Sequence, residues 1–206
     1  MEGDFPREHL PFQMPARKHT LSQEWRDLTF MHWEIDAQKL IPHLPSGLEV
    51  DTFEGKAYVG VVPFMMKNVR PKWFFSTPFV STFPEFNIRT YVSKDGIPGV
   101  YFLTLEAKSL VTCSYAPKAY GLPYNYAKGK ITKQGSIINW SSSRNDGDLD
   151  LIGTTEIYGT PQNAEPGSLE EFLFERYCLY TNKNGNIMRG YTHHKKWIFQ
   201  PAKVNI

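Results

Sequence analysis

The chain has 206 residues and a formal net charge of +2; 41% of its residues are hydrophobic and 15% are aromatic. So many large apolar side chains exclude a disordered chain and indicate a folded core within one large domain. The 23 basic and 21 acidic residues are interleaved along the chain, which argues against a nucleic-acid partner.

The sequence also indicates the cellular compartment of the protein. The longest apolar stretch, residues 57–66, is too short for a membrane span, which needs about 20 residues. The N-terminus carries no secretory pattern. Cys113 and Cys178 are the only cysteines and form no CxxC motif, so neither a disulfide framework nor a zinc site is indicated. We expect a reduced, cytoplasmic protein with no cofactor, no metal and no membrane partner.

The first quarter of the chain predicts an arm and then a mixture of strands and one short helix. Residues 1–23 hold three prolines without periodicity and predict a peripheral N-terminal arm, followed by a single domain over residues 24–206. Residues 28–35 are rich in aromatic and β-favouring side chains and predict a strand. Asp36 predicts the N-cap of a short helix over residues 37–41. Two further strands are predicted at residues 48–52 and 57–66.

The middle of the chain predicts a long loop and a hairpin. Residues 67–84 contain several turn-forming breaks and predict a loop that covers a pocket. Its aromatic side chains are Trp73, Phe74, Phe75, Phe79 and Phe83. A strand over residues 85–93 then pairs with residues 100–106, with turns at Asp95-Gly96 and Pro98-Gly99.

The second half of the chain predicts more strands and one good helix. The strands are predicted at residues 109–115, 126–132, 137–141, 152–158, 187–193 and 197–200. Ser168 and Glu171 form a capping box, and apolar side chains then recur at helical spacing as far as Tyr180. Many short strands with only two short helices favour a mainly β fold, built as a barrel or curved sheet with helices outside it or at one end.

One predicted strand carries a row of polar side chains on one face, because side chains alternate along a strand with a period of two. This polar row consists of Glu85, Asn87, Arg89 and Tyr91. The opposite face carries Phe86, Ile88, Thr90 and Val92. The row is either the solvated face of an ordinary amphipathic strand or, if it points into a barrel, a ligand site made of groups that form directional hydrogen bonds.

If the row is a ligand site, its two charged side chains have chemical roles. Arg89 holds a carboxylate or an enolate oxygen in a bidentate fork. Glu85 is a general acid or base, with a pKa that burial raises and Arg89 lowers. Tyr124, after a proline turn, is a second candidate acid or hydrogen-bond donor. His32 and His193 are further candidates for the pocket lining, although each neighbours a residue, Trp33 or His194, that points to the opposite face.

Several motifs resemble the YqjF-like family of uncharacterised proteins, over nearly the whole chain. They are Phe30-Met31-His32-Trp33, Leu44-Pro45-Ser46-Gly47-Leu48, Gly60-Val61-Val62-Pro63-Phe64, residues 83–92, Gly99-Val100-Tyr101-Phe102, Gly121-Leu122-Pro123-Tyr124, Glu175-Arg176-Tyr177 and His193. That family is similar to the acetoacetate decarboxylase superfamily. The resemblance implies an antiparallel, cone-shaped β-barrel with a closed and largely apolar cavity.

The resemblance also bears on the chemistry. Acetoacetate decarboxylase forms a Schiff base through one of two adjacent lysines that follow a Gly-aromatic-Pro step. In this chain Tyr124 and Asn125 stand at the matching positions, and a phenol cannot form an iminium with a ketone. Schiff-base decarboxylation is therefore not expected, since Lys118 and Lys128 are offset from that position. Glu85 looks equivalent to a glutamate of the superfamily cavity.

Three functions remain open on the sequence alone. The leading hypothesis is an enclosed pocket that binds a small organic acid or carbonyl compound. The second is a lyase, isomerase or dehydratase-like enzyme in which Arg89 fixes a carboxylate and Glu85 or Tyr124 moves a proton. The third is a structural or interaction protein with a filled barrel, in which Glu85 and Arg89 pair with each other.

Overall fold

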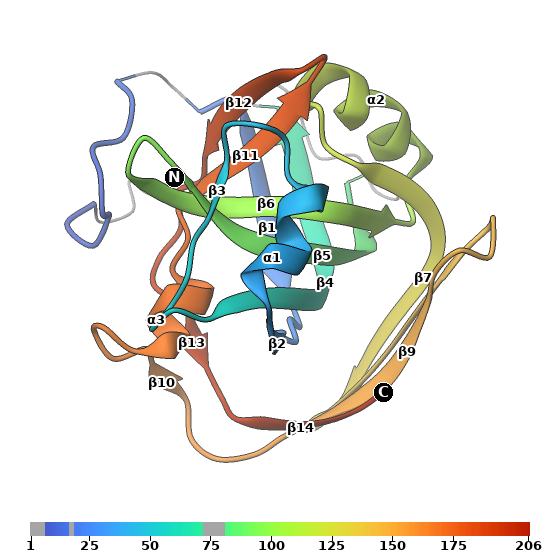
Figure 1. Cartoon of the computed structure of the whole chain (residues 1–206). Coiled ribbons are helices and arrows are strands. Elements are labelled where there is room, and N and C mark those ends of the chain that lie inside the picture. The colour runs from blue at the N-terminus through green and yellow to red at the C-terminus, as the bar shows by residue number, and fades with distance from the viewer. Residues whose placement is uncertain (1–6, 17–18, 72–80) are drawn as a thin grey trace.

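A curled β-sheet, open on one side as a half-barrel, dominates the fold (Figure 1). The computed structural model describes residues 7–16, 19–71 and 81–206. The strands of the sheet in this described part are β1 (Leu21–Arg26), β2 (Met31–Ile35), β3 (Glu49–Val50), β4 (Ala57–Pro71), β5 (Phe83–Lys94), β6 (Ile97–Ala107), β7 (Tyr124–Gln134), β8 (Ile137–Arg144), β9 (Asp150–Ile157), β11 (Cys178–Lys183), β12 (Asn186–Tyr191) and β14 (Ala202–Asn205). The mainly β fold is confirmed.

The strands follow one another along the sheet in the order β1-β4-β5-β6-β7-β8-β9-β14, with β2, β3, β11 and β12 joined to this path. Two pairings are parallel, β6 with β7 and β6 with β11. A parallel return needs a crossover connection, and α2 (Leu110–Tyr120) supplies it between β6 and β7. The sheet thus differs from the expected antiparallel barrel in two respects: it is mixed, and it is an open half-barrel.

The centre of the sheet is the hairpin of β5 and β6, whose turn at Asp95-Gly96 was predicted correctly, whereas the turn predicted at Pro98-Gly99 is wrong because both residues lie within β6. The two strands pair antiparallel around Asp95 and Gly96, whose φ angles are 54° and 72°. Such positive values at both central residues are typical of two-residue hairpin turns. Because β5 also pairs with β4, its backbone is held on both sides.

The strand predicted over residues 109–115 is wrong, because this segment is the start of α2. The Ser109 hydroxyl caps the helix by accepting a hydrogen bond from the Thr112 N–H at 3.2 Å. Gly121 ends it in the left-handed conformation, with φ at 69°, and its N–H donates to the Pro117 carbonyl. Side-chain capping at one end and a glycine at the other are the two common terminal signals of a helix.

The capped helix near the C-terminus exists but is shorter than predicted. It is α3 (Leu169–Phe174), with Ser168 accepting from the Glu171 N–H and the Glu171 carboxylate accepting from the Gly167 N–H. The prediction that it continues to Tyr180 is wrong, since that residue lies in β11. The Arg176 side chain donates to the Phe172 carbonyl, which no longer has a helical partner at this end.

The remaining elements are short. Asp36 caps α1 (Ala37–Leu40) as predicted, by accepting from the Gln38 N–H, and a 3-10 helix (Ile41–His43) follows. A separate two-stranded sheet pairs β10 (Gln162–Asn163) with β13 (Ile198–Phe199). None of the helices in the described part is long and apolar enough to cross a membrane.

Two predicted segments change at their ends. β1 begins at Leu21, inside the stretch expected to be the N-terminal arm, and pairs with β4. The loop expected over residues 67–84 is strand at its two ends, because β4 runs to Pro71 and β5 starts at Phe83. The loop's other aromatic residues, Trp73, Phe74, Phe75 and Phe79, lie outside the described residues.

Candidate functional site

The polar row lies in the interior of the protein and not in water. Its members are 2%, 0%, 5% and 0% exposed, in the order Glu85, Asn87, Arg89 and Tyr91. The opposite face of β5 is buried as well, with Phe86, Thr90 and Val92 fully covered. The interpretation of β5 as an amphipathic strand with a solvated polar face is therefore wrong.

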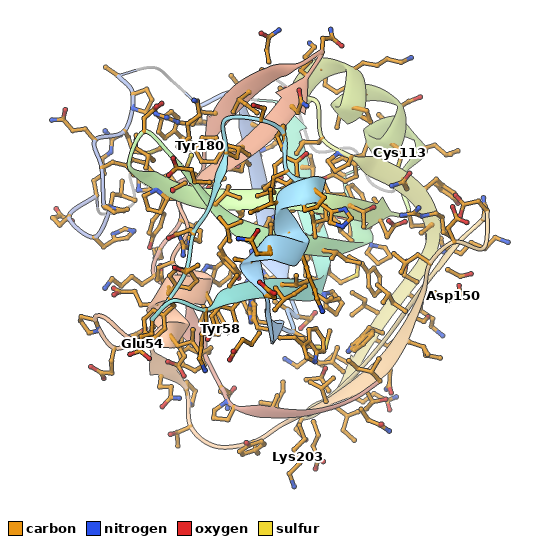
Figure 2. The ribbon with its side chains drawn as sticks, viewed as in Figure 1. Glu54, Tyr58, Cys113, Asp150, Tyr180 and Lys203 are labelled. Carbon is orange, nitrogen blue, oxygen red and sulfur yellow. The ribbon has the colours of Figure 1, made fainter. Side chains whose placement is uncertain are left out.

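Two apolar clusters flank the polar row at its two ends. One cluster includes Phe64, Ala107 and Cys113 near Glu85, and the other includes Tyr58 and Leu173 near Tyr91. Figure 2 shows Cys113 on α2 and Tyr58 on β4 at opposite sides of the central strands. The row is thus a line of polar groups between two apolar clusters.

At the Glu85 end of the row, the Glu85 carboxyl group is hydrogen-bonded to a tyrosine and has no basic partner among the described residues. The Tyr124 hydroxyl, at the start of β7, donates to Glu85 Oε2 at 2.9 Å. Burial raises the pKa of Glu85 to about 8, and the hydrogen bond from Tyr124 offsets part of this rise. At neutral pH this carboxyl group is therefore mainly protonated and can give a proton as well as accept one.

At the second end, Arg89 and Tyr91 share a backbone acceptor. Arg89 Nη2 donates to the Leu173 carbonyl at 3.1 Å and to the Tyr91 hydroxyl at 3.3 Å. The Tyr91 hydroxyl donates to the same carbonyl at 3.0 Å. The carbonyl lies near the end of α3, so this short helix fixes the direction of both side chains.

Arg89 is a buried cation that has no carboxylate partner in the described part of the chain. An arginine side chain stays protonated in proteins, and its Nε atom is buried without any hydrogen-bond partner among the described residues. Arg176 shows the contrast, because its Nη1 lies 2.6 Å from Asp51 Oδ2 in a mostly buried ion pair.

Asn87, between Glu85 and Arg89 on the row, has both atoms of its amide group buried without a hydrogen-bond partner in the described structure. It faces Val62 of β4 on one side and Leu105 of β6 on the other, and both are buried apolar residues. Buried polar groups in native proteins are almost always paired with protein, water or a ligand.

His32 reaches the row from β2, as the sequence allowed, and Trp33 points away from it into solvent. His32 Nε2 lies 2.7 Å from the Tyr91 hydroxyl. When that hydroxyl gives its own proton to the Leu173 carbonyl, Nε2 carries the proton of the ring. Burial lowers the pKa of His32 to about 3, with the charge of Arg89 adding to the effect, so the ring is neutral.

His193 is placed differently from the other candidates. Its ring stacks with that of His9, with centroids 6.3 Å apart, and this contact ties it to the N-terminal segment. The neighbouring His194 stacks on Tyr177 at 4.5 Å. The sequence did not indicate His9 as their partner, since the two segments lie at opposite ends of the chain.

Tyr124 and Asn125, which the resemblance places at the positions of the superfamily lysines, have different surroundings. Tyr124 faces Glu85, whereas the Asn125 amide donates to Thr104 Oγ1 at 3.0 Å, next to the buried pair of Glu106 and Arg144. Lys118 and Lys128 are both exposed. Among the described residues, no three His, Cys, Asp or Glu side chains are grouped so that they could hold a metal ion.

Two hollows lie elsewhere on the described surface. One, of about 400 Å³, is lined by residues of β7, β8 and β9, including Asn139 and Ile152. The other, of about 570 Å³, is formed by the N-terminal segment from Arg7 to Ala16. The enclosed pocket beside the polar row stays a prediction.

Known proteins resemble the chain in sequence and in fold. The DUF2071 family, described as an uncharacterized conserved protein, matches residues 22–206. The uncharacterized protein YqjF of Bacillus subtilis (strain 168) is 37% identical over 187 residues, which cover 90% of this chain and 77% of YqjF. Acetoacetate decarboxylase of Legionella pneumophila superposes with a TM-score of 0.67 at 15% identity, over 95% of this chain and 79% of that enzyme. The enduracididine biosynthesis enzyme MppR, complexed with pyruvate, gives a TM-score of 0.56 at 13% identity, over 84% of this chain and 66% of MppR.

Proposed function

The chain belongs to the DUF2071 family of uncharacterized conserved proteins and has the fold of acetoacetate decarboxylase, as its motifs implied, and on this premise we propose that it binds a small organic acid in an enclosed site at the polar row. The observation that carries the proposal is Arg89, a buried guanidinium without a carboxylate partner in the described structure. A buried charge without a counter-charge is costly. A ligand carboxylate offsets that cost, and the planar fork of arginine suits it.

The neighbours of Arg89 support a small ligand. Asn87 adds an amide without partners, and the protonated Glu85 adds a group that can donate to a ligand oxygen. Phe30 lies against the guanidinium, with Cζ 5.3 Å from the ring centre, and shields it from water. A structural neighbour, MppR, is complexed with pyruvate, which makes a three-carbon acid a reasonable first probe.

The test is calorimetric titration of the purified protein with propionate, pyruvate and lactate at neutral pH. We expect saturable binding of at least one of these acids, weakened at least about tenfold in Arg89→Gln because a charge-assisted hydrogen-bonded pair is lost. Arg26→Gln serves as the control, since it removes the same charge from a side chain that is 62% exposed, and it should leave binding unchanged. Absence of binding by all three acids, or equal binding by Arg89→Gln, would contradict the proposal and favour a structural role with a filled interior.

A second candidate function is proton transfer on the bound acid. It is favoured by the raised pKa of Glu85, because an acid or base with a pKa near the working pH transfers protons most effectively. We expect the protein to speed the exchange of the pyruvate methyl protons in D2O, followed by proton NMR, and Glu85→Gln to abolish that exchange. Binding without exchange would leave a recognition function only. Borohydride treatment with pyruvate should give no lysine adduct by intact mass.

A further inference from the structure

The amide of Asn87 needs both a hydrogen-bond donor and an acceptor from a ligand, which a carboxylate alone does not supply. Its side chain is completely buried, and neither Nδ2 nor Oδ1 has a hydrogen-bond partner among the described residues. The amide therefore lacks both an acceptor for its protons and a donor for its oxygen. Exchanging the positions of nitrogen and oxygen, which is a matter of assignment, leaves the same two needs unmet.

An apolar residue would serve the fold better at this position. Val62 and Leu105 lie directly across from Asn87 on the two neighbouring strands, and both are fully buried. Leaving a buried donor or acceptor unpaired is destabilising, whereas an apolar residue of the same shape is neutral or stabilising. The amide thus has no structural role that the described contacts reveal, and its position between Glu85 and Arg89 places it within the row.

The spacing of Asn87 and Arg89 along the strand favours a short ligand. Residues two apart on a strand lie about 7 Å from each other along it and point to the same side. The buried Nε of Arg89 is also without a partner in the described structure. A short acid held by its carboxylate at Arg89 would then have its second or third carbon on the side of Asn87.

Building on the proposed function, we infer that the ligand is a short hydroxy acid, whose carboxylate pairs with Arg89 and whose hydroxyl both accepts from and donates to the amide of Asn87. A ketone only accepts hydrogen bonds and leaves Oδ1 unpaired, and a plain alkyl chain leaves both amide atoms unpaired. A hydroxyl has one donor proton and two acceptor lone pairs, so it meets both needs with a single atom.

The experiment compares three acids of nearly equal size by calorimetry: propionate, pyruvate and lactate, the last as its separate enantiomers. We expect one lactate enantiomer to bind at least about tenfold more tightly than pyruvate or propionate, a factor that corresponds to about 1.4 kcal/mol. In Asn87→Leu, which has nearly the same shape, lactate should bind no better than propionate, while the folded state should keep its thermal stability or gain some. The wild-type ranking alone tests the inference if that variant does not fold.

A matched control removes a second explanation. Asn139→Leu changes an exposed asparagine that lines the outer hollow of β7, β8 and β9, and it should keep the wild-type preference for lactate. Loss of the preference in this variant would place the hydroxy acid at the outer hollow and overturn the inference. Equal binding of the three acids with the dependence on Arg89 intact would overturn it too, while leaving the proposed function in place. Failure of all three acids to bind would overturn both this inference and the proposed function.

Discussion

Two arginines lie close to the ring of Tyr91, and their different partners explain different roles. The Cζ atoms of Arg89 and Arg176 lie 5.6 Å and 5.0 Å from the centre of that ring. Arg176 is paired with Asp51 and also donates to the Phe172 carbonyl, so its contacts are those of a structural residue. Arg89 has a backbone acceptor and a phenol but no ion pair with a carboxylate among the described residues, and this is the condition on which its proposed role as a ligand group rests.

This difference predicts opposite effects on stability. Arg176→Met leaves the Asp51 carboxylate without its partner and should lower the free energy of unfolding by about 3 kcal/mol. Arg89→Met removes an uncompensated buried charge, and in the absence of ligand it should change the free energy of unfolding by less than about 1 kcal/mol. Urea denaturation of the two variants measures both values. A loss for Arg89→Met as large as that for Arg176→Met would show that Arg89 holds the fold together.

Single residues were predictable from the sequence where a local pattern fixed their direction. The alternation along β5 placed all four residues of the polar row on one face, and the proline turn before Tyr124 brought that residue to Glu85. Arg176 was missed, because its partner Asp51 is 125 positions away and no local pattern reveals such a pair. Leu173 was missed as a site residue because it acts through its backbone carbonyl, which every residue has.

Between elements, the close approach of β2 and β4 depends on one glycine. Gly60 pairs with both His32 on β2 and Arg89 on β5. A Cβ atom at this position would lie 2.9 Å from the His32 ring, closer than side-chain carbons normally come. The absence of a side chain at Gly60 therefore makes the space in which His32 reaches the Tyr91 hydroxyl.

Gly60→Ala should push the His32 ring out of this space and break its hydrogen bond to Tyr91. We expect a loss of about 2 kcal/mol in the free energy of unfolding, typical of overpacking in a well-packed core. In the double variant His32→Ala with Gly60→Ala, the alanine at position 60 should cost much less than it does alone, because the clashing ring is gone. Equal costs in the two backgrounds, measured in a double-mutant cycle, would show that His32 is not what the glycine accommodates.

The elements themselves were predicted less evenly than the residues. Strands with strong alternation, such as β5 and β7, were found with small errors at their ends. The sequence predicted a strand at the start of α2 because Val111 and Thr112 are β-branched, while the helical state depends on the cap at Ser109 and the left-handed Gly121. α3 was extended too far because Tyr177 and Tyr180 continue a helical spacing by coincidence, although pairing with β6 and β12 draws the segment after residue 177 into the sheet.

In the whole molecule, the sheet buries both faces of its central strand, and a carboxyl group in that interior makes stability depend on pH. The folded state raises the pKa of Glu85 to about 8, above the value of about 4.3 that a glutamate has in an unfolded chain. The folded protein therefore keeps a proton that the unfolded chain has already released. The stabilising effect of this proton is complete below about pH 4 and is lost as the pH rises towards 8.

We accordingly expect the free energy of unfolding to fall as the pH rises from about 5 to 8, by up to about 1.4 kcal/mol for each pH unit from this group. Glu85→Gln, which is neutral at every pH, should remove that part of the slope. Glu156→Gln, an exposed substitution of the same kind, should leave the slope as it is. Thermal unfolding followed by circular dichroism at several pH values measures the slope. If Glu85→Gln keeps the wild-type slope, the Glu85 carboxyl group is already ionised in the folded wild-type protein.

The position of the polar row on a strand that is paired on both sides has a consequence for how this fold can diversify. The backbone hydrogen bonds of β5 are made with β4 and β6 and do not depend on which side chains the row carries. Each side chain of the row can therefore be exchanged without altering the course of the strand, and each would address a separate atom of a bound molecule. With the proposed binding site on this strand, a lineage with this architecture could acquire new ligand preferences by single replacements there, without remodelling any loop.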